Sequence, residues 1–302
     1  MTRPPTTRPY EQRFIDAAPG IRLWADVTGD RDATPLLLIM GANASGLAWP
    51  DALVARLAER HWVLRYDHRD TGRSTRAFAE HPYPILDLAA DALAVLDGFG
   101  VERAHVVGMS LGGMLVQLLL LDAPERVRSA TVFSTGALEI DPPVAGAAQP
   151  PGPSEEVLAM WEHLGEPRDR AAEVAFNVEH WRLLSGAEWG GEFEESEFRA
   201  LEERIRDHAG HDDPTVAHSL ADASNLARGA ELAQVRTPML VIEAPLDPVF
   251  PPPHAAHLAS LIPGARVVTI PRMGHALPSA VLPALADAIL AHTAEAERGC
   301  RS

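Results

Sequence analysis

The stretch RAHVVGMSLGGMLVQLLL, residues 103–120, contains one serine between glycines at the point where a strand-like run becomes a helical one. Residues 104–107, AHVV, favour a strand and end in two β-branched valines, whereas residues 114–121 form a longer run that is apolar apart from Gln117. A chain that passes from strand to helix on one residue needs strained backbone angles and small neighbours. The glycines of GMSLG, residues 108–112, meet that need, so we predict a sharp turn that exposes the hydroxyl of Ser110.

This turn matches the G-x-S-x-G pattern, in which a strand precedes and a helix follows an exposed nucleophilic serine. The pattern by itself is weak, and a glycine-rich turn with an incidental serine is the alternative. The surrounding sequence therefore has to decide between the two interpretations.

Composition narrows the class of protein. The chain has 302 residues, 46% of them hydrophobic and 23% charged, as is usual for a globular protein of one large domain. A formal net charge of −16 argues against nucleic acid and anionic membranes as partners. Residues 1–9 lack an apolar stretch, and the single cysteine, Cys300, permits no intrachain disulfide. We expect a cytoplasmic protein without a membrane span.

Strand-like and helix-like segments alternate along most of the chain, which indicates an α/β fold with a mostly parallel central sheet flanked by helices. Helices are predicted over residues 51–60, 86–99 and 280–294, in addition to the one after Ser110. Strands are predicted over residues 21–27, 36–40, 61–66, 104–107, 127–133, 239–243 and 266–270.

Residues 137–220 interrupt this alternation. They begin with a proline-rich loop and continue as charged helical segments, with 17 acidic residues and 6 arginines between residues 155 and 213. We predict a helical lid (cap) inserted into a core formed by residues 1–136 and 221–302. Its acidity suits a cationic substrate group, but a solvated helix face is the simpler interpretation.

Two further residues have the chemistry that a serine nucleophile requires. A serine hydroxyl needs a base to take its proton, and the base needs an acceptor that fixes its tautomer. Asp247 lies just past the predicted strand 239–243, and His275 follows the strand 266–270. The order Ser, Asp, His and the position of all three at strand ends predict a triad at the carboxyl edge of the sheet.

Acyl transfer also requires donors for the developing oxyanion. The backbone N–H of Leu111, next to the nucleophile, is one candidate. The loop after an early strand supplies the other, and in LLLIMGANASG, residues 36–46, we favour the N–H of Ala42.

Four segments carry a resemblance to a known family: LLLIMGAN, LRYDHRDTGRST, DALAVLDGFGVERAHVVGMSLGG and IPRMGHALPS. Together they resemble the α/β-hydrolase fold and, more narrowly, the aclacinomycin methylesterases of anthracycline biosynthesis, over roughly residues 20–295. The resemblance implies Ser110 as nucleophile, Asp247 as orienting residue, His275 as base, and the N–H groups of Ala42 and Leu111 as oxyanion hole. The chain departs from the family at Ala42, where a second glycine is usual.

Candidate residues for binding the substrate are Asn43, Met109, Trp161 and Trp181. The tryptophans suit a flat polycyclic ligand, although packing within a thin lid is an equal alternative. No metal site is expected, because His208 with His211, and His254 with His257, have the wrong spacing for two ligands on one helix face.

The sequence thus predicts a serine esterase that needs no cofactor and acts on a small-molecule ester. The resemblance points to a methyl ester of a polyketide in antibiotic biosynthesis. Hydrolysis of another ester or a macrolide-type lactone, C–C bond hydrolysis and cofactor-free perhydrolysis remain open, as does a ligand-binding scaffold without turnover. The sequence leaves the oligomeric state undetermined.

Overall fold

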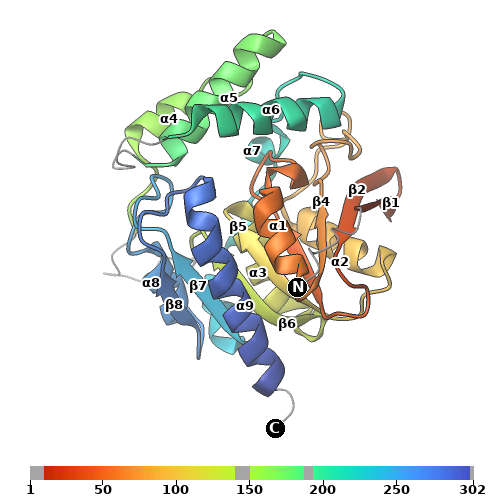
Figure 1. The fold of residues 1–302 in the computed structure, drawn as a ribbon, viewed down its shortest axis with the longest axis vertical. Coiled ribbons are helices and arrows are strands. Elements are labelled where there is room, and N and C mark those ends of the chain that lie inside the picture. Colours follow the sequence, from red (N-terminus) through yellow and green to blue (C-terminus); the bar gives the residue numbers. More distant parts are fainter. Residues whose placement is uncertain (1–9, 140–149, 187–192, 300–302) are drawn as a thin grey trace, which may run out of the picture.

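The computed structural model describes residues 10–139, 150–186 and 193–299. Its centre is a sheet of eight strands in the order β1-β2-β4-β3-β5-β6-β7-β8 (Figure 1). The strands are β1 (Glu11–Ala18), β2 (Ile21–Thr28), β3 (Pro35–Ile39), β4 (Trp62–Tyr66), β5 (Ala104–Met109), β6 (Val127–Phe133), β7 (Met239–Glu243) and β8 (Arg266–Thr269).

The predicted parallel sheet is present from β4 to β8, and β1 and β2 extend it with antiparallel pairs. The apolar pattern of the sequence did not predict β1. This strand lies at the edge of the sheet and is mostly exposed, so it lacks the apolar run of a buried strand. The short turn into β2 contains Gly20 with a φ of 78°.

Helices cover both faces of the sheet. On one face lie α1 (Asp51–Ala58) and α9 (Leu282–Gly299), and on the other α2 (Leu86–Gly98), α3 (Leu111–Asp122) and α8 (His254–Leu261). Apolar side chains of the central strands alternate between the two cores: Leu37 and Ile39 of β3 face one, while Leu36 and Leu38 face the other. This alternation follows from the twofold side-chain period of a strand.

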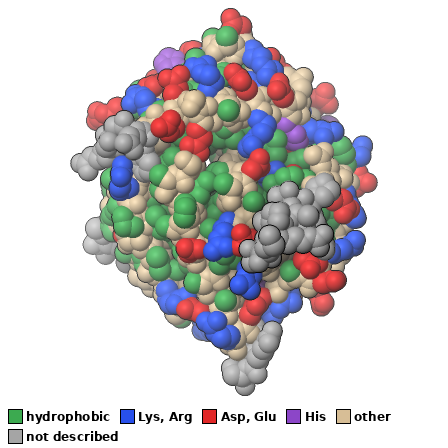
Figure 2. Space-filling view, viewed as in Figure 1, with side chains coloured by type: hydrophobic (Ala, Val, Ile, Leu, Met, Phe, Trp, Pro, Cys, Tyr) green, Lys and Arg blue, Asp and Glu red, His purple; other side chains and the backbone are tan. Residues whose placement is uncertain are grey.

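Among the described residues between β6 and β7 are four α-helices: α4 (Glu155–Trp161), α5 (Arg170–Leu184), α6 (Glu195–Ala209) and α7 (Ala217–Leu220). Figure 1 shows α4, α5 and α6 together beyond one edge of the sheet. On the face shown in Figure 2, charged side chains gather over this region. The predicted proline-rich loop falls mainly on residues 140–149, which lie outside the described residues.

The turn between β5 and α3 has the tight packing that the sequence predicts. A Cβ atom at Gly108 would lie 2.3 Å from the carbonyl oxygen of Gly112, and one at Gly112 would lie 2.2 Å from that of Ile39. Real side chains do not approach backbone oxygens so closely, so a residue with a Cβ at either position would force the neighbouring backbone to shift.

Within the described residues, no helix has the length and apolarity needed to cross a membrane.

Replacing Gly112 tests this packing. Gly112→Ala is expected to lower the free energy of unfolding by about 1–3 kcal/mol, because the added methyl group must push β3 away from α3. Gly165→Ala is the matched control, since its nearest neighbour would be a side-chain atom of Val216 at 3.9 Å. Urea denaturation of both variants measures the difference, and equal stabilities would contradict the steric argument.

Candidate active site

Ser110 lies at the carboxyl end of β5, immediately before α3. Its backbone has φ 55° and ψ −123°, a conformation that non-glycine residues rarely adopt. Its N–H donates to the carbonyl oxygen of Phe133 on β6 at 3.1 Å, which fixes the turn to the neighbouring strand. Strain of this kind persists only where the surrounding structure holds it, and it gathers at functional sites.

Asp247 and His275 form a buried pair at the same edge of the sheet. Nδ1 of His275 lies 3.1 Å and 3.0 Å from the two carboxylate oxygens of Asp247. The N–H groups of Val249 and Phe250 also donate to Asp247, at 2.8 Å and 3.0 Å. Burial raises the pKa of Asp247, but the charge of His275 and these hydrogen bonds outweigh it, so its pKa is lowered. The carboxylate is therefore ionised and holds the proton of His275 on Nδ1.

Ser110 and His275 line one cavity of about 720 Å³, a volume typical of small-molecule sites. Ala42 and Leu111 line it too. The structure thus brings the predicted triad and both predicted oxyanion donors to one place. Among the contacts of the described residues, however, no hydrogen bond joins Ser110 to His275.

The loop after β3 packs directly against Ser110. A Cβ at Gly41 would lie 3.2 Å from the Cβ of Ser110. Asn43 follows with a φ of 58°, and its amide group bonds to α7: Nδ2 donates to Oγ of Ser219 at 2.8 Å, and Oδ1 accepts from the N–H of His218 at 3.0 Å. Asn43 lines the cavity as predicted, but these bonds fix its side chain in a structural contact.

His218 completes this connection and was not found from the sequence. Its Nδ1 accepts from the N–H of Asn43 at 2.8 Å, and its Nε2 lies 3.0 Å from the carbonyl oxygen of Arg69. A carbonyl oxygen only accepts, so the proton is on Nε2. Burial, followed by repulsion from His68, lowers the pKa of His218 to about 3. His218 is thus a neutral link between two loops.

Met109, Trp161 and Trp181 also line the cavity. Both indole N–H groups are satisfied: Trp161 donates to Nε2 of His180 at 3.0 Å, and Trp181 donates to Glu202 at 2.7 Å. The two tryptophans also pack against the apolar cluster under α4–α6, which supports the packing interpretation, and their contact with the substrate stays a prediction.

Buried charged side chains of α5 and α6 also line the cavity. Glu173 accepts from Nη2 of Arg206 at 3.1 Å, and Arg206 also lies 3.9 Å from Glu202. Burial raises the pKa of Glu202 against the opposing effects of Trp181 and Arg206. Part of the acidity of residues 155–213 is therefore buried in ion pairs beside the cavity, which the solvated-face interpretation did not anticipate.

Helix α6 is bonded to the core through Asp67, which follows β4. The carboxylate of Asp67 accepts from Oγ of Ser45 at 2.5 Å, from the N–H groups of Gly46 and Arg73, both at 2.9 Å, and from Nε2 of His208 at 2.7 Å. Its side chain is completely buried. One carboxylate thus connects the loop after β3, the loop after β4 and α6.

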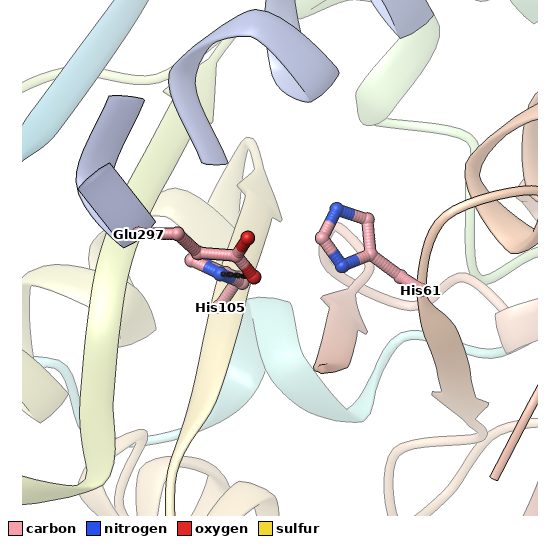
Figure 3. Close-up of side chains that lie close together, drawn as sticks. All are labelled: His61, His105 and Glu297. Atoms are coloured by element: carbon pink, nitrogen blue, oxygen red, sulfur yellow. Dashed lines mark ion pairs between the residues drawn. The ribbon is translucent and has the colours of Figure 1, made fainter. Parts of the chain in front are cut away.

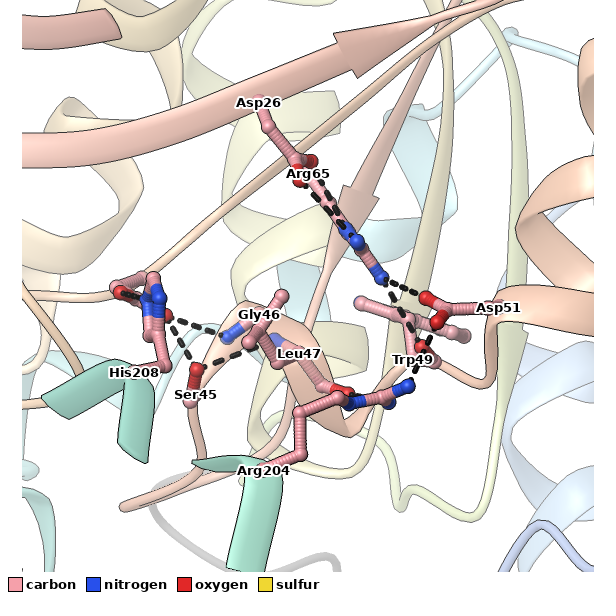
Figure 4. Close-up of polar contacts among 10 residues, drawn as sticks. Asp26, Ser45, Gly46, Leu47, Trp49, Asp51, Arg65, Arg204 and His208 are labelled. Carbon is pink, nitrogen blue, oxygen red and sulfur yellow. Dashed lines mark hydrogen bonds and ion pairs between the residues drawn. The ribbon is translucent and has the colours of Figure 1, made fainter. Parts of the chain in front are cut away.

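A second connection runs through Arg204, four residues before His208 on α6. Arg204 donates to Asp51 at 2.6 Å and to the carbonyl oxygen of Leu47 at 3.0 Å. Asp51 in turn pairs with Arg65, which is buried against Asp26 (Figure 4). Arg204 therefore bonds α6 to the segment that follows β3, and His208 bonds it to Asp67 after β4.

The fold and this site define a class of enzyme. Residues 34–278 match the family model described as alpha/beta hydrolase fold, so the chain belongs to the α/β-hydrolase fold family.

Within that family the chain is similar to two anthracycline enzymes. It is 51% identical to rhodomycin D methylesterase DnrP of Streptomyces peucetius and 50% identical to rhodomycin D methylesterase DauP of Streptomyces sp. strain C5, in each case over 90% of this chain and 95% of the relative. A solved hydrolase from Pseudomonas aeruginosa PA01 superposes with a TM-score of 0.70 at 27% identity, covering 93% of this chain and 98% of that one. The chain is an ester hydrolase.

The protonation state of His218 predicts a pH dependence. Its folded pKa of about 3 lies below the unfolded value of about 6.5, so below pH 6.5 only the unfolded chain gains this proton. His218 therefore lowers the free energy of unfolding by about 1.4 kcal/mol per pH unit as the pH falls from 6.5. Urea denaturation between pH 6.5 and 4.5 measures this slope. In His218→Gln the free energy of unfolding should fall less steeply with decreasing pH, by about this amount. Parallel slopes would contradict the assignment.

Proposed function

We propose that this protein hydrolyses the methyl ester of a polycyclic polyketide of the anthracycline type, with Ser110, His275 and Asp247 as its catalytic triad. One observation carries the proposal: the Asp247–His275 pair and the strained Ser110 turn face a single cavity. The identity of about one half to rhodomycin D methylesterases supports the substrate class.

The mechanism follows from the groups in place. Oγ of Ser110 attacks the ester carbonyl carbon while Nε2 of His275 takes its proton, and Asp247 stabilises the resulting imidazolium. His275 then returns the proton to the departing methoxide, which leaves as methanol. A water molecule, deprotonated by His275, hydrolyses the acyl-enzyme and releases the free carboxylic acid.

The oxyanion is proposed to lie between the N–H groups of Leu111 and Ala42. Leu111 begins α3, where the N–H groups have no partner within the helix and the helix dipole favours negative charge. The loop that contains Ala42 lies against Ser110, and Ala42 N–H donates to no acceptor among the described residues. His218 is proposed to position this loop through its bond to Asn43 N–H.

Helices α4–α7 are proposed to be the lid, within residues 137–220, over a core of residues 1–136 and 221–302. The support is the lining of the cavity, to which the core contributes Ser110 and His275 and the helices contribute Trp161 and Trp181. We also propose a cytoplasmic location, on the ground that one cysteine permits no intrachain disulfide.

Replacing the nucleophile tests the mechanism. Ser110→Ala is expected to lower kcat for p-nitrophenyl acetate at least about 1,000-fold, because the variant lacks the hydroxyl on which the acyl-enzyme is proposed to form. The variant should keep the circular dichroism spectrum of the parent. A fluorophosphonate probe should label the parent at Ser110 with a stoichiometry of one. Undiminished turnover in the variant, or an unlabelled parent, would refute the triad.

Replacing Trp161, which lines the cavity, tests the substrate class. Trp161→Ala is expected to raise KM for a polycyclic aromatic methyl ester about tenfold, which corresponds to about 1.4 kcal/mol of lost contact, and to leave KM for p-nitrophenyl acetate nearly unchanged. Leu158→Ala, on the exposed side of the same helix, is the control and should change neither value. Equal effects of Trp161→Ala on both esters would indicate that the ring supports the fold and does not contact the substrate.

A further inference from the structure

A second cluster of chemically reactive side chains lies at the amino edge of the sheet, away from the cavity. His61 immediately precedes β4, His105 is the second residue of β5, and Glu297 is in the last turn of α9. One ligand atom from each of the three lies within 4.8 Å of the other two. Figure 3 shows the two imidazole rings and the carboxylate directed toward a common space. His105 and Ser110 are five residues apart on the extended β5, about 17 Å at 3.3 Å per residue.

The hydrogen bonds of His61 put its proton on Nδ1, so Nε2 is an acceptor whose present partner is a hydroxyl group. Nδ1 lies 3.1 Å from the carbonyl oxygen of Thr34, which can only accept, so Nδ1 has the proton. Nε2 lies 2.9 Å from Oγ1 of Thr293. That hydroxyl also lies 3.1 Å from the carbonyl oxygen of Leu290, so it has a second acceptor if Nε2 binds something else.

His105 presents a buried nitrogen without a hydrogen bond. Its Nδ1 is 2.8 Å from Oγ of Ser129, and its side chain is 1% exposed. Nε2 has no hydrogen-bond partner among the described residues, and Oε1 of Glu297 lies 3.5 Å from it. A buried polar atom that lacks a partner in a protein interior calls for an explanation.

Two imidazoles and a carboxylate are a ligand set that Zn²⁺ uses, with a fourth position for water. Histidine ligands of metals almost always donate their other ring N–H to a carbonyl or hydroxyl group, which fixes the tautomer. Thr34 and Ser129 are placed for this role toward His61 and His105. Tetrahedral coordination requires the ligand atoms to approach to about 3.4 Å, a closure that the side chain of Glu297, which is 34% exposed, can provide.

We propose that His61, His105 and Glu297 bind one Zn²⁺ ion and thereby fix the carboxyl end of α9 to β4 and β5. The site is structural, because β5 separates it from Ser110. The sequence predicted no metal site, on the spacing of the histidine pairs 208/211 and 254/257, and the cluster of His61, His105 and Glu297 departs from that expectation.

Isothermal titration calorimetry with ZnCl₂ on the full chain, after treatment with EDTA, tests the proposal. One site per chain is expected, and Glu297→Gln should weaken its affinity at least tenfold. Glu295→Gln is the matched control, because Glu295 lies on the same turn and pairs instead with Arg266. It should bind Zn²⁺ like the parent.

A second measurement keeps the test independent of histidine variants that fail to fold. Co²⁺ added to the parent is expected to give the visible absorption of a four-coordinate site, and Glu297→Gln should lose that absorption. Zn²⁺ should raise Tm of the parent and not of Glu297→Gln, while ester hydrolysis is the same before and after EDTA treatment. No stoichiometric site in the parent, or equal binding by Glu297→Gln and Glu295→Gln, would overturn the proposal.

Discussion

The backbone at Ser110 is the constraint on which the rest of the site depends. A serine at φ 55° is unfavourable, and it persists because α3 packs so closely on β3 and β5 that the chain has no other route. The two glycines on either side make that approach possible. The same turn places Ser110 and the start of α3 on the cavity wall, against the loop after β3. Fold and chemistry therefore share one strained residue.

The cavity is enclosed by contacts that run between the core and helices α4–α7. Asp67 accepts from His208 of α6, and His218 of α7 accepts from the loop after β3. Helix α5 contributes the carbonyl oxygen of Leu184, which accepts from the N–H of His275 at 2.7 Å. Buried, charge-assisted hydrogen bonds such as that of Asp67 are the strong ones, and breaking one leaves an uncompensated group.

The sequence predicted the fold and the site residues best where local pattern and chemistry coincide. The parallel strands, the turn at Ser110 and the positions of Asp247 and His275 at strand ends follow from apolar periodicity and from the order of the three residues. It failed for β1, because an exposed edge strand paired with β2 has no distinctive pattern. It also missed His218, whose role depends on contacts with Asn43 and Arg69. These two residues are separated from His218 by 175 and 149 positions in the chain. The cluster of His61, His105 and Glu297 was invisible for the same reason, since metal-ligand spacing is recognisable only within one element.

The bond between Leu184 and His275 has a consequence for how such an enzyme changes its substrate. The segment that shapes the binding space is tied to the backbone of the residue proposed to move protons, so neither can be exchanged as a separate module. A helix grafted from a relative would arrive without the matching loop and would shift the imidazole. New specificity is therefore expected to arise by side-chain replacement along the existing wall.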